Sequence, residues 1–447
     1  MKSTIFFVAS SILLQPQSSL AEANEAASDA ASSAAPQGQQ SQQQFEQQLD
    51  DMQRDYDRRL SRIEKRLKET QKATRTQKAN TFNPAISLIL NGTFSSYEND
   101  PDNYKLPGYA LSNEAGQAPE NISLGESELT LGANVDHLFY GQATFALADD
   151  AGETIIETEE AYFETLALGG GWIVKAGRFF SAIGYLNEKH RHAWDFIGAP
   201  LVYRGLLGDQ LVQDGVRLSW ILPTDTYFLI GSEVGNGVHF PSAGNHSGVG
   251  DWLVFAKTGG DIGLSHSWQL GISHWQANDV RDRLSQGQNT PSFSGDSRIE
   301  ALDVVYKWAP EGNARQRNLK LQAEFFHRSE NGVMTLEDTA QSSSYDGSQN
   351  GWYAEAVYQF IPKWKAGVRY DYLDSSNSGS DNVVLGDSEL LAYGYTPQRV
   401  GVMLAWLPSE FSRIRVQYNR DESSADTDNQ FFIQYTMVMG THGAHTY

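Results

Sequence analysis

The chain has 447 residues, no cysteine and a formal net charge of −21 at pH 7. The absence of cysteine excludes disulfide frameworks and thiolate metal sites, and the acidic balance argues against nucleic-acid binding, which needs a basic face. This length would suit several soluble domains, but a regular series of strand-like segments after Pro84 indicates one large β-barrel instead.

The first 21 residues have the pattern of a secretory signal peptide. Lys2 supplies a positive start, Thr4–Leu14 is a short apolar run, and Ser19–Ala21 has small residues at the positions that a signal peptidase reads. The run is too short to span a bilayer as a helix, and no later stretch of about 18 apolar residues follows it. Residues 22–41 are mostly Ala, Ser and Gln with scattered acids, which predicts a disordered linker.

Residues 42–80 are predicted to form a periplasmic coiled coil. Apolar residues recur there at steps of three and four, with charged residues on the other faces. This apolar stripe consists of Phe45, Leu49, Met52, Tyr56, Leu60, Ile63 and Leu67. Because a lone helix of this length is marginally stable in water, we expect it to associate with copies of itself, as a homotrimer. A single amphipathic helix resting on another surface is the alternative.

Residues 84–447 are predicted to form an antiparallel transmembrane β-barrel of sixteen strands. Apolar and polar residues alternate along segments of about 9–11 residues, the length that crosses a bilayer. In one such segment, Ile414 alternates with Arg413 and Arg415. Since lipid offers the backbone no hydrogen-bond partner, a closed barrel is the form of sheet that can lie in it.

The links between the strands alternate between short and long. The short links are Val135–His137, Leu168–Gly171, Pro223–Asp225, Ile361–Lys363 and Leu407–Glu410. The long, polar links are Glu98–Asn121, Ser181–Gln213, Gly237–Asp251, Gln276–Arg298, Ser329–Asn350 and Leu373–Pro397. Outer-membrane barrels have this asymmetry, because their periplasmic turns are short and their extracellular loops are long.

The size of the barrel predicts which way the side chains point. A sixteen-stranded barrel is too wide for its side chains to fill, so we expect a water-filled interior lined by the polar set and an apolar outer surface facing lipid. Tryptophans sort by strand direction, which predicts aromatic girdles at both membrane interfaces. We expect Trp172, Trp220, Trp268, Trp308, Trp364 and Trp406 at the periplasmic rim, and Trp252, Trp275 and Trp352 at the outer rim.

Within this architecture, Lys175–Gly184 (KAGRFFSAIG) resembles the strand-to-loop segment of the phosphate-selective porin O/P family. Tyr447 resembles the C-terminal aromatic residue that outer-membrane assembly machinery reads. The resemblance implies a Gram-negative outer-membrane porin, a sixteen-stranded homotrimeric channel surrounded by outer-membrane lipid and lipopolysaccharide. It also implies that the link Ser181–Gln213, after the fifth strand, folds inward and narrows the channel.

Charged residues on this link and on the wall are the candidate pore-lining and constriction residues, because charges in a narrow pore select ions by sign. The candidates on the link are Glu188, Lys189, His190, Arg191, His192, Asp195 and Arg204. The candidates on the wall are Arg217, Lys320, Glu324, Arg328, Arg369, Arg413 and Arg415. The last wall strands are the more basic, which favours anion preference. The alternative is that these charges keep the wall wet and pair with one another.

These patterns predict an outer-membrane porin for passive diffusion of small hydrophilic solutes or ions, with no cofactor and no enzymatic activity. A substrate-specific or metal-related channel is the alternative. His190 and His192 would project to one side of an extended chain with Asp195 nearby, which is an arrangement that zinc accepts, although loop histidines more often serve as hydrogen-bonding groups. His442 and His445 offer the same arrangement with less support.

An outer-membrane enzyme or a structural tether is the alternative of a different class. Catalytic groups such as His274 and Asp279 could converge near the outer rim, but the chain contains no Gly-x-Ser-x-Gly nucleophile elbow. A tether is supported by the predicted helical stalk alone.

Overall fold

The structure is a computed structural model of the chain, and it describes one unit. The described residues are 84–440 except 114, 126, 151–152 and 245–247, with the backbone alone at 148–150 and 153–154. The predicted signal peptide, linker and coiled coil lie outside the described residues, as do His442, His445 and Tyr447. Within the described part of the chain, no helix is long and apolar enough to cross a membrane.

Antiparallel strands form one closed sheet. They are β1 (Ala85–Ser96), β2 (Asn121–Leu124), β3 (Ser127–Asn134), β4 (Phe139–Asp150), β5 (Glu153–Thr165), β6 (Trp172–Phe180), β7 (Val212–Ile221), β8 (Tyr227–Gly235), β9 (Asp251–Ile262), β10 (His266–Leu284), β11 (Pro291–Trp308), β12 (Asn318–Leu336), β13 (Gln341–Ile361), β14 (Trp364–Gly379), β15 (Gln398–Ser409), β16 (Ser412–Glu422) and β17 (Asp428–Gly440).

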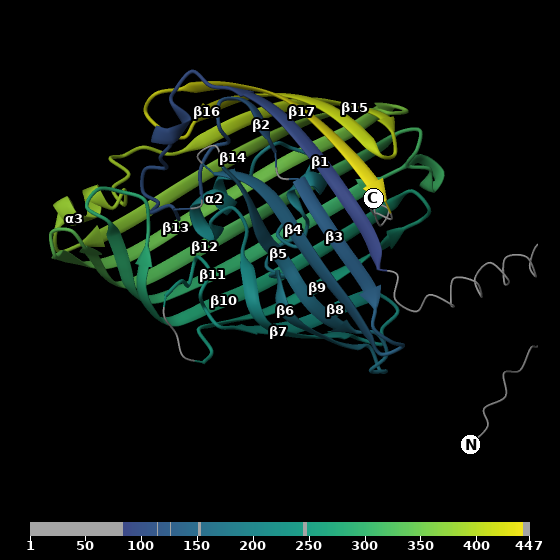
Figure 1. Cartoon of the computed structure of the whole chain (residues 1–447), viewed down its shortest axis with the longest axis horizontal. Coiled ribbons are helices and arrows are strands. Elements are labelled where there is room, and N and C mark those ends of the chain that lie inside the picture. The colour runs from purple at the N-terminus through teal and green to yellow at the C-terminus, as the bar shows by residue number, and fades with distance from the viewer. Residues whose placement is uncertain (1–83, 114, 126, 151–152, 245–247, 441–447) are drawn as a thin grey trace, which may run out of the picture. The chain divides into compact units, whose positions relative to one another are not determined.

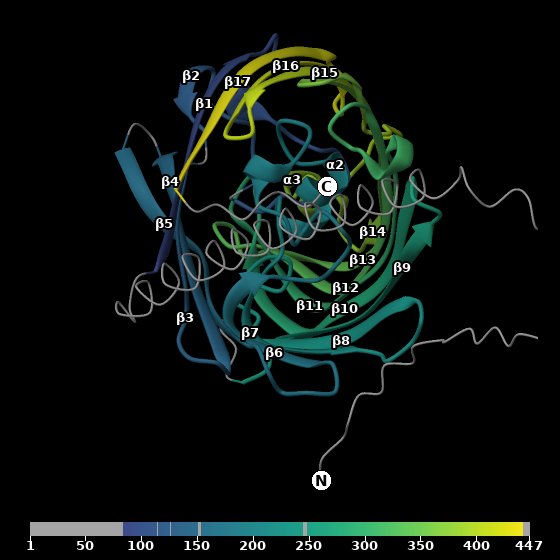
Figure 2. The same ribbon diagram turned by 90° about the vertical axis from the view of Figure 1, so that its right-hand side faces the viewer.

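Closure follows from the pairing of the first strand with the last. Consecutive strands pair along the chain, and β1 pairs with β17 from Ser87 opposite Gly440 to Ser96 opposite Phe431 (Figures 1 and 2). β2 and β3 pair with different parts of the same strand, β1, so together they make one wall strand. The 17-stranded sheet therefore contains sixteen wall strands, as predicted.

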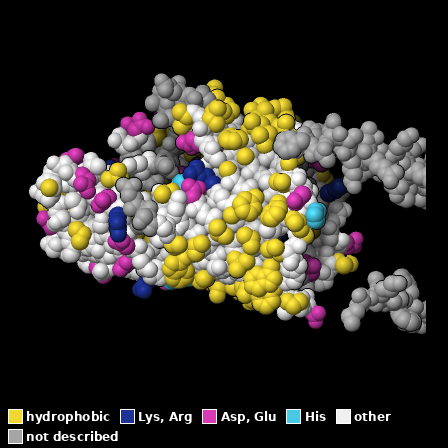
Figure 3. All heavy atoms as spheres, turned by 60° about the horizontal axis from the view of Figure 1, so that its bottom comes forward, with side chains coloured by type: hydrophobic (Ala, Val, Ile, Leu, Met, Phe, Trp, Pro, Cys, Tyr) yellow, Lys and Arg dark blue, Asp and Glu magenta, His cyan; other side chains and the backbone are white. Residues whose placement is uncertain are grey.

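Alternation along the strands separates an apolar outer face from a polar inner face. On β15, Val402 and Leu404 are 46% and 43% exposed, whereas Met403 between them is 5% exposed. On β16, Val416 is 36% exposed and its neighbour Arg415 is 1% exposed. Hydrophobic side chains gather in a broad patch on the outer surface (Figure 3). The predicted directions are confirmed here, since period-two alternation places successive side chains on opposite faces of a strand.

Two of the predicted long loops are instead mostly β-ladder. β10 and β11 stay paired up to Leu284 opposite Ser292, and β12 and β13 stay paired up to Leu336 opposite Gln341. These hairpins form long strands that extend toward α3, at the left of Figure 1. Polar composition gave the wrong prediction of loops at Gln276–Arg298 and Ser329–Asn350, because a strand that extends beyond lipid has water on one face and can be polar.

Stacked tryptophan pairs mark one rim of the barrel. The rings of Trp172 and Trp220 lie 5.1 Å apart with a 6° angle between their planes, and those of Trp364 and Trp406 lie 6.1 Å apart at 21°. All these residues are near strand ends that short turns join. This placement is the one the aromatic girdle requires, with amphipathic rings at the membrane interface.

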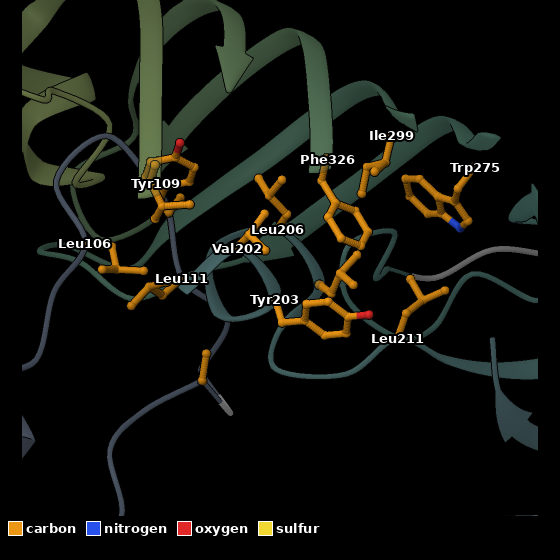
Figure 4. Close-up of a cluster of buried hydrophobic side chains, with 14 of the residues drawn as sticks. Leu106, Tyr109, Leu111, Val202, Tyr203, Leu206, Leu211, Trp275, Ile299 and Phe326 are labelled. Atoms are coloured by element: carbon orange, nitrogen blue, oxygen red, sulfur yellow. The ribbon is translucent and has the colours of Figure 1, made fainter. Parts of the chain in front are cut away.

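Trp275 is an exception, and its predicted place in the outer girdle is wrong. Its side chain is fully buried in the interior apolar cluster (Figure 4). On β10 it is in phase with Ser273 and Ala277, which are also buried, and out of phase with the exposed Ile272. Counting in steps of two along the strand would have placed it inside.

Two long links fold into the barrel and bring apolar side chains with them. Residues 97–120 and residues 181–211 pack against inward-facing apolar residues of the wall, in the cluster drawn in Figure 4. Its labelled members are Leu106, Tyr109, Leu111, Val202, Tyr203, Leu206, Leu211, Trp275, Ile299 and Phe326. The expectation of an interior lined throughout by polar side chains is wrong in this region. Chain that folds inward removes apolar wall residues from water, which stabilises them there.

Short helices shape these links. α2 (Leu201–Leu207) follows Pro200 and ends at Gly208, whose φ of 67° is the left-handed conformation that often terminates helices. α3 (Asn382–Asp387) begins at Asp381, whose side chain accepts a hydrogen bond from Val383 N. The 3-10 helices are η1 (Pro101–Asn103), η2 (Arg191–Ala193) and η3 (Pro310–Gly312).

Candidate functional site

The candidate site is the inner segment, residues 181–211, together with the wall residues that hold it. The two ends of the segment are joined, since Ser181 N donates to Leu211 O at 3.0 Å. The Asn187 amide donates to Ser181 O at 2.8 Å and to Leu211 O at 2.9 Å, and its oxygen accepts from Leu211 N at 2.8 Å. Because a buried backbone group without a partner is costly, Asn187 fixes the neck of the segment.

Glu324 on β12 binds the segment from the wall. Its carboxylate accepts hydrogen bonds from Tyr185 N and Leu186 N, both at 3.0 Å, and from the Tyr203 hydroxyl at 2.9 Å. The Tyr353 hydroxyl on β13 donates to the same carboxylate at 2.5 Å. Glu324 is 2% exposed. The residue predicted to line the pore therefore acts as a buried acceptor that anchors two peptide groups and a phenol.

Arginines on the last wall strands donate to main-chain oxygens of the segment. Arg369 donates to Gly198 O at 3.1 Å, and Arg399 donates to Ala199 O at 2.7 Å. Arg413 donates to His192 O at 2.7 Å and to Trp194 O at 3.2 Å. Arg415 donates to the oxygens of Trp194 and Asp195, at 2.8 and 2.5 Å. Hydrogen bonds with an ionised donor are stronger than those between neutral groups. This row of arginines therefore holds the main chain of the inner segment in place.

A network of opposite charges lies where the segment leaves β6. Arg217 Nε is 2.7 Å from Glu233 Oε1, and its Nη1 is 2.7 Å from Glu188 Oε1. Lys257 Nζ is 2.5 Å from Glu188 Oε2. Glu233 also accepts from the Ser181 hydroxyl at 2.7 Å. Burial by itself would raise the pKa of Glu188, but Lys257 and Arg217 outweigh it and lower that pKa to about 2.

Half-buried lysines surround another part of the segment. Lys320 Nζ is 2.6 Å from Asp195 Oδ2 and 3.0 Å from Glu355 Oε1. Lys307 interacts electrostatically with Lys189 and Lys320. Burial lowers the pKa of Lys189, and the charge of Lys320 adds to the effect. These lysines keep part of their surface accessible, unlike Arg369, Arg399 and Arg415, so this is a basic part of the interior that a solute could meet.

The remaining predicted residues divide between core and surface. Arg204 Nε is 3.3 Å from Asp209 Oδ1, and Arg328 donates to Gln349 Oε1 at 2.7 Å. Both arginines are buried, at 5% and 0% exposure, so their side chains belong to the packed interior. The Arg191 side chain is 42% exposed, with its Nη2 at 3.8 Å from Asp209 Oδ2.

The two histidines of the segment meet a glutamate, not the expected aspartate. His190 Nδ1 lies 3.1 Å from Glu128 Oε2, and His192 Nδ1 lies 2.6 Å from Glu128 Oε1. Asp195, predicted as their neighbour, pairs with Lys320 instead. The prediction failed because η2 turns the chain between His190 and Asp195, whereas the sequence argument assumed an extended chain.

Several residues of the site were not predicted from the sequence. Glu128 and Glu233 bind the inner segment from the wall, and Asn187 joins its two ends. A polar residue in an inward strand phase was the available signal for Glu128 and Glu233. His274 and Asp279, considered above as a catalytic pair, each pair with another residue. His274 Nδ1 lies 3.4 Å from Glu300 Oε1, and Asp279 pairs with Arg281.

The chain is similar in sequence to a known protein over most of its length. No family model matches it. A protein of Aquifex aeolicus (strain VF5), described as uncharacterized, is 32% identical over 400 residues, which cover 83% of this chain and 81% of that protein. The chain belongs to the family of this Aquifex protein.

Solved structures share the fold at low identity. The anion-selective porin from Comamonas acidovorans is 10% identical, with a TM-score of 0.50 over 80% of this chain and 99% of that one. OmpT, an outer membrane protein of Vibrio cholerae in its trimer form, is 11% identical, with a TM-score of 0.50 over 80% of this chain and 99% of that one. This chain therefore has the barrel fold of the outer-membrane porins.

Proposed function

We propose that this protein is an outer-membrane porin through which small hydrophilic solutes or ions diffuse passively. The apolar outer face suits lipid and the charged inner face suits water, which supports a membrane-embedded barrel with an aqueous path. The observation that carries the proposal is the inner segment, residues 181–211, anchored inside the wall by Glu324 and the arginine row. An inserted segment of this kind turns a wide barrel into a narrow path, where charge and size decide what passes.

The proposed placement follows from the strand directions. The short turns face the periplasm, the long hairpins face outward, and outer-membrane lipid and lipopolysaccharide surround the wall. The helix predicted at residues 42–80 would lie in the periplasm and join copies of the chain. A homotrimer is the proposed assembly, which the trimer form of the Vibrio cholerae protein supports.

A weak preference for anions is part of the proposal. Lys189 and Lys307 are half-buried, whereas Glu324 is buried under the segment and offers no charge to a solute. The fold neighbour from Comamonas acidovorans is an anion-selective porin, which is in line with this sign. The resemblance of Lys175–Gly184 to the phosphate-selective porins makes inorganic phosphate the first anion to test.

A gated, substrate-specific channel is a second candidate, and one observation favours it. The apolar cluster between residues 97–120, the inner segment and the wall is fully buried at its centre, with Tyr203 and Phe326 at 0% exposure. Water and ions avoid such a region, so conduction through this part of the barrel would require the links to move.

Electrical recording in planar bilayers tests the proposal. Purified protein should give stepwise conductance, in groups of three if the trimer forms, and a reversal potential of anion-selective sign under a KCl gradient. Lys307→Gln should reduce that reversal potential, whereas Arg317→Gln, on an exposed turn, should leave it unchanged. A correctly folded barrel that conducts no ions under any applied voltage would overturn the porin proposal, and conductance that begins only with one added solute would favour the gated channel.

A further inference from the structure

Histidines of the inner segment and glutamates of the wall come together at one point. His190 Nδ1 lies 3.1 Å from Glu128 Oε2 on β3 and 3.4 Å from Glu159 Oε2 on β5. The other ring nitrogen, His190 Nε2, lies 2.9 Å from Glu160 Oε2. The ring of His192 stacks on that of His190 at 5.6 Å, and its Nδ1 is 2.6 Å from Glu128 Oε1. Three carboxylates thus surround two imidazoles.

Several atoms at the centre of this group are buried without a hydrogen bond. They are Glu128 Oε2, Glu159 Oε2 and His190 Nδ1, and the Glu128 side chain is 1% exposed. These atoms face one another at 3.1 and 3.4 Å, but the angles between them are not those of hydrogen bonds. A buried carboxylate oxygen without a hydrogen bond is unfavourable, and a cation bound among these atoms would remove that cost.

Among the described residues, no lysine or arginine forms an ion pair with these carboxylates. Within that part of the chain, the ion-pair partners of Glu128, Glu159 and Glu160 are the two histidines. Burying charges of one sign is unfavourable unless an opposite charge joins them. A metal dication supplies that charge, and so does a proton on His190; the experiment below separates the two.

The ligand atoms lie close enough together to share one metal ion. One ligand atom each from Glu128, His190 and His192 lies within 4.8 Å of the other two. Zinc–nitrogen and zinc–oxygen bonds of about 2.0–2.1 Å in a tetrahedron place neighbouring ligands roughly 3.3–3.4 Å apart. The distance from His190 Nδ1 to Glu128 Oε2, 3.1 Å, is close to that edge, and His192 Nδ1 lies nearer, at 2.6 Å from Glu128 Oε1. Two imidazoles with carboxylate oxygens are a donor set that suits zinc better than magnesium or calcium.

We propose that Glu128, His190 and His192 bind a divalent transition metal of the zinc class. Glu160 would accept the hydrogen bond of His190 Nε2 and orient the ring, as carboxylates commonly do beside metal-bound histidines. The metal joins β3 and the inner segment. It therefore fixes the segment to a strand of the wall other than those that carry the arginine row.

Metal content is measured on the full-length protein, purified in detergent without a histidine tag and carrying His442→Asn and His445→Asn to remove the two histidines near the C-terminus as ligands. After treatment with EDTA and dialysis against ZnCl2, mass spectrometry of the elements should count one zinc per chain. Glu128→Gln and His190→Asn should each weaken zinc binding by more than roughly 10-fold, since even second-sphere changes cost that much. Glu157→Gln, an exposed glutamate on β5, is the matched control and should bind normally.

Folding is checked by the shift in gel mobility between heated and unheated samples, so loss of zinc in an unfolded variant does not count as support. X-ray absorption of the zinc-loaded protein, with Glu128 and His190 intact, does not depend on a site variant that folds, and should show two imidazole ligands with oxygen neighbours. Stoichiometric zinc with fewer than two imidazoles, or no zinc retained by the folded protein, would refute the site and leave a protonated His190 as the balancing charge. Because these measurements do not involve conduction, they stand or fall separately from the porin proposal.

Discussion

Removing the Glu324 carboxylate should release the inner segment from the wall. Glu324 accepts hydrogen bonds from Tyr185 N, Leu186 N and the Tyr203 hydroxyl of the segment, at 2.9–3.0 Å. Hydrogen bonds to a charged partner contribute about 1.5–3 kcal/mol each, so three would sum to about 4.5–9 kcal/mol if they were additive. Bonds that share one acceptor are not independent, so we take roughly 4 kcal/mol for Glu324→Ala.

This loss has a measurable consequence. Roughly 4 kcal/mol corresponds to about a thousandfold change in the equilibrium between attached and detached segment. Limited proteolysis of the folded protein should therefore cut within residues 181–211 far faster in Glu324→Ala, and single-channel conductance should rise as the path widens. Glu410→Ala, in an exposed turn, is the control and should change neither.

One outcome would show that Glu324 does not anchor the inner segment. If Glu324→Ala folds normally by gel mobility and its proteolysis and conductance match those of the unsubstituted protein, the carboxylate does not anchor the segment. The arginine row would then be sufficient to hold it. A rise in conductance without faster proteolysis would instead mean that Glu324 affects the path by its shape or charge alone.

Three other predictions concern the wall, the network and the segment. Leu404→Arg on the outer face should lower barrel stability by roughly 2–4 kcal/mol in urea unfolding followed by tryptophan fluorescence, whereas Ser409→Arg at the strand end should not; equal effects would contradict the assigned faces. The lowered pKa of Glu188, about 2, means that its ion pairs are complete above its ordinary value of 4.5 and are lost as pH falls through about 2. Glu188→Gln should therefore shift the reversal potential equally at pH 7 and pH 4, and a shift that vanishes at pH 4 would show an ordinary pKa. Arg415→Gln should shift the reversal potential toward cations, whereas Arg415→Lys should preserve it and still speed proteolysis of the segment, because lysine keeps the charge but lacks the guanidinium fork.

The barrel itself could be predicted from the sequence because its rules are local and repeat. The period of two placed Val416 outside and Arg415 inside, and lipid leaves a closed barrel as the form of sheet that satisfies the backbone. The extents of strands could not be predicted where the wall extends into water. At Gln276–Arg298 polar residues continue the ladder, because a β-strand outside lipid needs pairing but no apolar face.

The candidate site could be predicted in part. The charged residues of the inner segment were identified, but their partners were not, because partners come from distant strands. Glu128 is 64 positions from His192, and nothing near either residue in sequence points to the other. Asp195 was the sequence neighbour, and it pairs with Lys320. Composition also could not reveal the apolar cluster inside the barrel, because leucine suits a lipid-facing position as well as a buried one.

The arginine row bears on two separate properties of the pore. One is which side chains contact the solute, and the other is the sign of the electric field in the path. Arg413 and Arg415 donate to main-chain oxygens and to Gln434, which carry no net charge. A hydrogen bond to such an acceptor occupies the donor but leaves the positive charge uncancelled, whereas Lys320 and Asp195 cancel each other at a distance. Arginines that touch no solute can therefore still favour anions in the path beside the segment. For the same reason the net charge of −21, much of it in loops, does not decide the selectivity of the interior.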